Sequence, residues 1–142
     1  MAGPELAVVD ASVAAKWFLP ERDSESARSL RLAHLDARAS LVAPAILPYE
    51  VGNALRFHPR LGAEVVGRAV AQLLDVQVRL DPPSPEALDA AVRVAFRTGL
   101  TVYDACYLAL AERLDCPLYT ADKRQIAADP TRVRNVRDFT EG

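Results

Sequence analysis

Four carboxylates in this sequence stand where they could bind a metal ion: Asp10, Glu50, Asp104 and Asp122. Asp10 directly follows the short apolar run at residues 6–9, and Asp122 lies two residues after the run at 117–120. Ligands of open α/β sheets bind at the carboxyl ends of the strands, so we expect both aspartates at that edge. Each of them also suits the N-cap of a following helix, which would be a purely structural role.

Glu50 and Asp104 fall within predicted helices that are largely apolar. Glu50 has Ile46 four residues before it and Ala54 four residues after it, so its side chain is expected along the apolar stripe. The alternative is a side chain at the edge of that stripe with its carboxylate in solvent. Asp104 stands in the first turn of an almost wholly apolar helix, where a carboxylate needs a partner or a cation. Its spacing from Thr101 also fits a capping box.

Three aspartates and one glutamate at a single sheet edge would form a site made only of oxygen donors. Oxygen ligands select hard cations, chiefly Mg²⁺ or Mn²⁺. Magnesium keeps several waters and binds through a few carboxylates together with substrate phosphate, which leaves a water for activation. The acidic set therefore indicates hydrolysis of phosphodiester bonds.

The elements that must position these acids alternate along the chain. Short apolar runs predict five strands, and longer runs with helical spacing predict the helices between them. This alternation is typical of an α/β fold with a short parallel sheet flanked by helices. The predicted strands are 6–9, 41–43, 76–80, 117–120 and 133–136, and the predicted helices include 12–18, 24–38, 45–57, 61–74, 88–96 and 103–114, with another after Asp122.

Length and composition limit the number of domains and the kinds of partner that this chain can have. The 142 residues suit one domain over 1–142, and 17 basic against 19 acidic side chains give a net charge of −2. No run of like charges suggests a nucleic-acid tail or a membrane-binding helix, and no apolar segment reaches the roughly 18 residues of a membrane span. We therefore expect a cytoplasmic protein that does not enter a membrane.

Three segments resemble the PIN-domain ribonucleases, most closely the VapC-type toxins of prokaryotic toxin-antitoxin pairs. The segments are VVDASVAAKWF at 8–18, PAILPYEVGNAL at 44–55 and LTVYDACYLALAERLDCPLYTAD at 100–122. The resemblance implies a PIN-like fold, endonuclease activity on RNA that depends on Mg²⁺ or Mn²⁺, homodimerisation, and inhibition by a small antitoxin protein.

The same resemblance assigns roles to individual residues. It identifies the catalytic, metal-binding set with the four acids Asp10, Glu50, Asp104 and Asp122. Ser12 and Thr120 match the hydroxyl positions that hold these acids or a water, and Asn53, one helical turn after Glu50, is a candidate support for it. Lys16 and Arg124 flank the acids in sequence and are candidates for holding RNA phosphates, the alternative being solvated surface charges.

Two other kinds of protein remain open at this point. One is a receiver-like α/β module in which an acidic pocket binds Mg²⁺ without catalysis, and the other is a catalytically silent PIN-like scaffold for protein interaction. A receiver would need paired acids near the first strand, where only Asp10 stands. Self-association is expected in either case, because the helix around residues 65–74 leaves apolar surface to cover.

Overall fold

The structure is a computed structural model that describes residues 3–139. Its centre is a parallel sheet of five strands in the order β3-β2-β1-β4-β5. Val8 of β1 pairs with Val42 of β2 on one side and with Leu118 of β4 on the other. The strands are β1 (Glu5–Val9), β2 (Ala39–Pro44), β3 (Arg79–Asp81), β4 (Leu118–Thr120) and β5 (Val133–Asn135).

This sheet confirms the predicted α/β fold and its parallel strands. β4 is buried throughout, and β1 and β2 are buried over most of their length, as expected of strands covered on both faces. A receiver-like fold has the strand order 2-1-3-4-5, which differs from the order found here. The receiver-like interpretation is therefore wrong as a description of this fold.

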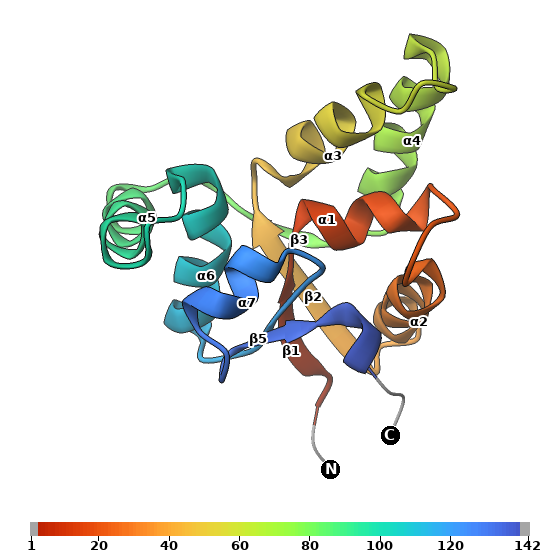
Figure 1. Cartoon of the computed structure of the whole chain (residues 1–142). Coiled ribbons are helices and arrows are strands. Elements are labelled where there is room, and N and C mark those ends of the chain that lie inside the picture. Colours follow the sequence, from red (N-terminus) through yellow and green to blue (C-terminus); the bar gives the residue numbers. More distant parts are fainter. Residues whose placement is uncertain (1–2, 140–142) are drawn as a thin grey trace.

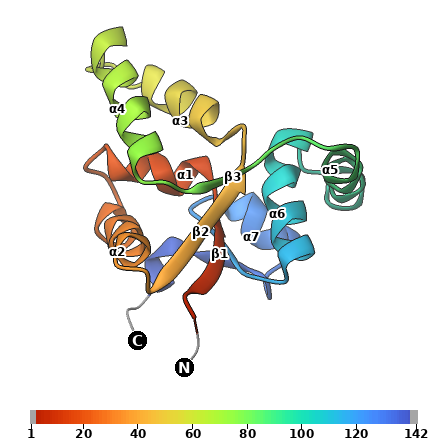
Figure 2. The same cartoon turned by 180° about the vertical axis from the view of Figure 1, so that it is seen from behind.

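Among the described residues, seven α-helices and two 3-10 turns surround the sheet. Figures 1 and 2 show α6 on one face of it and α1 and α2 on the other, while α5 packs on the outer side of α6. The pair α3 and α4 extends beyond the end of β2 that leads into α3. The elements are α1 (Ala11–Ala14), η1 (Ala15–Trp17), α2 (Ser24–Leu35), α3 (Leu47–Arg56), α4 (Ala63–Asp75), α5 (Pro85–Thr98), α6 (Val102–Leu114), α7 (Lys123–Ala128) and η2 (Val136–Asp138).

Residues in the left-handed region shorten two of the predicted elements. The helix expected over 24–38 ends at Leu35, because Ala37 turns into the left-handed region with φ 60° before β2 begins. The strand expected over 76–80 is reduced to Arg79–Asp81, because Gln77 also adopts positive φ, at 61°. The strand lies at the edge of the sheet.

Helix α6 is the central helix of the core. Its residues Ala105 and Tyr107 through Ala111 are buried, and the helix contacts both β1 and β2. α5 packs on α6 instead of on the sheet, so its apolar residues Leu88, Val92 and Phe96 are exposed. Within residues 3–139 no helix is long and apolar enough to cross a membrane.

Candidate active site

Asp10 is a buried carboxylate at the carboxyl end of β1. One of its oxygens accepts hydrogen bonds from Ser12 Oγ at 2.6 Å and from the backbone N–H of Val13 at 3.2 Å, which also caps α1. The other oxygen accepts from Thr120 Oγ1. Burial raises the pKa of Asp10 to about 6, and the charge of Asp122 adds to this rise, against the lowering effect of the hydrogen bonds. The site therefore presents a desolvated acid that a cation would stabilise.

Ser12 and Thr120 join the carboxyl ends of two neighbouring strands. Ser12 Oγ accepts from the backbone N–H of Ala121 at 2.9 Å, and Thr120 Oγ1 accepts from that of Asp122 at the same distance. The two hydroxyl oxygens lie 3.2 Å apart. These bonds place Asp122 beside Asp10, and the Asp122 carboxylate in turn caps α7 by accepting from the backbone N–H of Arg124 at 2.9 Å.

Glu50 is partly buried on α3, at the edge of the buried stripe that Leu47, Val51 and Leu55 form, whereas Ala54, one turn after it, is exposed. Tyr107 Oη of α6 donates a hydrogen bond to Glu50 Oε1 at 2.6 Å. Burial raises the pKa of Glu50, the bond from Tyr107 lowers it, and the negative charge of Asp104 raises it again. The carboxylates of α3 and α6 therefore act on each other electrostatically.

Asp104 occupies the first turn of α6 with its carboxylate partly exposed. Thr101 Oγ1 accepts from the backbone N–H of Asp104 at 3.1 Å, which is the helix-capping half of the predicted box. The carboxylate itself lies 3.6 Å from the Arg124 guanidinium, which also lies 3.5 Å from Asp122. The backbone oxygen of Asp104 accepts from Gln125 Nε2 at 2.9 Å, which ties α7 to α6.

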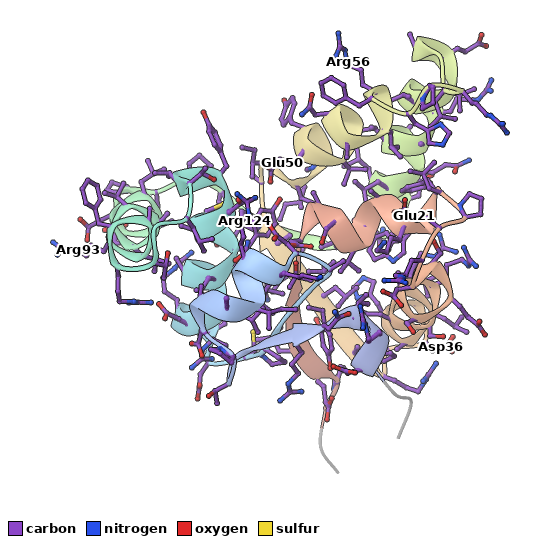
Figure 3. The ribbon with its side chains drawn as sticks, viewed as in Figure 1. Glu21, Asp36, Glu50, Arg56, Arg93 and Arg124 are labelled. Carbon is purple, nitrogen blue, oxygen red and sulfur yellow. The ribbon has the colours of Figure 1, made fainter. Side chains whose placement is uncertain are left out.

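The acids come from four different elements and lie at one end of the sheet. Figure 3 labels Glu50 on α3 and Arg124 at the start of α7, on the same side of the molecule. The four acids offer only oxygen atoms as metal ligands, and burial removes water from Asp10 and Glu50. The four acids therefore suit a hard divalent cation. In the described residues, however, no three His, Cys, Asp or Glu side chains are gathered to hold an ion.

A cleft of about 380 Å³ opens beside Glu50 on α3. Its lining includes three exposed residues, Asn53, Tyr49 and Tyr103, of which the two tyrosines are 80% and 63% exposed. Lys16 is placed differently from Arg124: it is buried, and its ammonium contacts Glu21 and the backbone oxygen of Arg22. Of the two basic candidates, the structure brings Arg124 to the acids.

The sequence interpretation missed two residues of this region, Tyr107 and Gln125. Both are almost fully buried, and each contacts an acid-bearing residue on another element. Tyr107 follows Asp104 by three residues, which places it on the same helix face, but within an apolar helix that spacing reads as core packing. Gln125 Oε1 is a buried oxygen that has no hydrogen-bond partner among the described residues.

Comparison with known proteins agrees with this fold. The family model described as PIN domain matches residues 7–129. A relative from Pyrobaculum aerophilum, "Ribonuclease VapC3", is 38% identical over 131 residues, which cover 89% of this chain and 96% of the relative. The chain therefore belongs to the PIN-domain family, and within it to the VapC-type proteins.

Solved structures show the same architecture. The crystal structure of PAE2754 from Pyrobaculum aerophilum superposes with a TM-score of 0.69 at 26% identity, covering 91% of this chain and 83% of that one. A chain of a toxin-antitoxin complex from Klebsiella pneumoniae gives a TM-score of 0.67 at 17% identity, covering 92% and 97%. At that identity the second comparison supports the fold alone.

Proposed function

We propose that this protein is a metal-dependent endoribonuclease that acts as the toxin of a toxin-antitoxin pair. The observation that carries the proposal is the Asp10 carboxylate, buried between two hydroxyls, with three further acids around the same sheet edge. Membership in the VapC-type family supports it, since the relative from Pyrobaculum aerophilum carries the name ribonuclease. The proposal places the protein in the cytoplasm, where its RNA substrate is found.

The proposed cofactor is Mg²⁺ or Mn²⁺. Asp10, Glu50 and Asp104 would hold one ion, and Asp122 would complete that site or assist a second ion. Such an ion supplies Lewis-acid chemistry, lowering the pKa of a water and neutralising charge on the scissile phosphate. The chain needs no nucleophile of its own for this reaction.

The protein's own residues orient the acids. Ser12 and Thr120 donate to the two oxygens of Asp10 and hold its carboxylate in one direction. Asn53 lines the cleft next to Glu50 and is positioned to contact a substrate there. Arg124 is the proposed phosphate contact, because its side chain is 73% exposed and its guanidinium lies beside Asp104 and Asp122. Lys16 is the weaker candidate, because its ammonium is occupied by Glu21 and Arg22.

Two protein partners belong to the proposal. A small antitoxin would block the site, as the family resemblance implies. A second copy of the chain would cover the exposed apolar residues Leu88, Val92 and Phe96 of α5, which follow one another at helical spacing. These residues are a better candidate for the dimer interface than α4, where Val65 and Leu74 are exposed and Leu73 is buried.

The direct test is cleavage of single-stranded RNA by the purified chain, freed of any antitoxin. We expect cleavage with Mg²⁺ or Mn²⁺ and none with EDTA. Asp10→Asn, which keeps the shape of the side chain, should lose cleavage. Activity that survives exhaustive chelation, or an Asp10→Asn variant that cleaves like its parent, would refute the proposed mechanism.

A further inference from the structure

Tyr107 carries a hydroxyl that reaches a proposed metal ligand on a different helix. The residue is 1% exposed, and its Oη donates to Glu50 Oε1 at 2.6 Å across a sequence separation of 57 residues. That distance is in the range of a hydrogen bond to an ionised oxygen, which is about twice as strong as a neutral one. The bond joins α3 to α6, the helices that carry Glu50 and Asp104.

The Tyr107 hydroxyl acts on the Glu50 carboxylate as a hydrogen-bond donor. In this bond the phenol Oη–H is the donor and Glu50 Oε1 is the acceptor. With Oε1 held, rotation of the Glu50 carboxylate is restricted and Oε2 keeps one direction. Asp104, three residues before Tyr107, lies on the same face of α6.

We infer that Tyr107 is a positioning residue, whose hydroxyl sets the orientation in which Glu50 binds the divalent ion. This inference rests on the proposed function. A phenylalanine would fill the same space in the core, so the hydroxyl is separable from the packing of the ring. Groups that hydrogen-bond to metal ligands typically change metal affinity or activity by 10- to 100-fold when removed.

The test is Mn²⁺ binding to the full chain, measured by electron paramagnetic resonance, in which the signal of free Mn²⁺ is lost on binding. Tyr107→Phe should bind Mn²⁺ about 10-fold or more weakly than the parent. Its RNA cleavage should recover when Mn²⁺ is raised to saturation, whereas that of Glu50→Gln should not. Tyr119→Phe is the matched control, since Tyr119 is also buried and its ring packs edge-on against Phe139.

Each result decides the inference. Weaker Mn²⁺ binding in Tyr107→Phe, with parental binding in Tyr119→Phe, supports it. Parental binding in Tyr107→Phe overturns it, as does an equal loss in both variants, which would indicate a general loosening of the core. A cleavage defect that saturating Mn²⁺ does not restore also overturns it. A parent chain that neither binds Mn²⁺ nor cleaves RNA refutes the proposed function itself, and the inference with it.

Discussion

The burial of Asp10 makes the stability of the metal-free protein depend on pH. The pKa of Asp10 is about 6 in the folded chain, against 3.8 for the free side chain. Because the folded value is the higher one, the folded state retains a proton that the unfolded state has lost between these values, and the free energy of unfolding falls as pH rises through them. The gap from 3.8 to about 6, at 1.36 kcal/mol per pKa unit, amounts to about 3 kcal/mol.

Asp10→Asn removes this charge and can keep the local hydrogen bonds. The new amide oxygen can accept from Ser12 and Val13, and the amide nitrogen can donate to Thr120, whose hydroxyl is able to accept. In EDTA at pH 8 we expect the variant to be more stable than its parent, by at most about 3 kcal/mol. The difference should shrink as the pH falls toward 4, where the parent also carries a neutral Asp10.

The measurement is urea unfolding followed by circular dichroism at several pH values between 4 and 8. Asp75→Asn is the control, since it removes the same charge from an exposed position. The same unfolding curves should be measured with Mg²⁺ present. Mg²⁺ should raise the free energy of unfolding of the parent and leave that of Asp10→Asn unchanged, because an ion that binds only the folded state shifts the unfolding equilibrium. A parent-variant difference that does not vary with pH, or that grows on acidification, would refute the reasoning.

Three further changes test other parts of the site. Asp104→Asn should abolish RNA cleavage. Its thermal stability at neutral pH should equal or exceed that of the parent, since Thr101 accepts from the backbone N–H of residue 104, which the substitution keeps. A variant that is active but destabilised would show that Asp104 only caps the helix. Arg124→Ala should weaken RNA binding in EDTA, measured by fluorescence anisotropy, and lower the slope of log affinity against log salt by about 1; an unchanged slope would remove Arg124 from the phosphate contacts. If the parent forms the proposed dimer in light scattering, Phe96→Glu should be monomeric under the same conditions, and a variant that still dimerises like the parent would argue against α5 as the interface.

Local sequence patterns were sufficient for most of the elements. Gly99 ends α5 at φ 81°, as a glycine after an apolar helical run predicts, and Asp10 and Asp122 cap the helices that follow them. Alternating strands and helices predicted the parallel sheet, and with it the edge at which those two aspartates lie. These features depend on a few neighbouring residues, so a single sequence contains them.

Burial and partner choice were decided by the tertiary structure. Lys16 is enclosed because the chain after η1 folds back and brings Glu21 and the Arg22 carbonyl to its ammonium. Phe96 is 88% exposed because α5 packs on α6 and not on the sheet. An apolar side chain at helical spacing has the same sequence signature in both situations, since periodicity defines a face but not what covers it.

The contact between Tyr107 and Glu50 was also decided by the tertiary structure. The residues are 57 positions apart, and their hydrogen bond requires α3 and α6 to meet at the carboxyl end of the sheet. That meeting depends on the strand order β3-β2-β1-β4-β5, which local propensity does not specify. The residue types at the acidic site could therefore be predicted from the sequence, whereas the hydroxyl that orients one of them became visible only when distant helices were packed together.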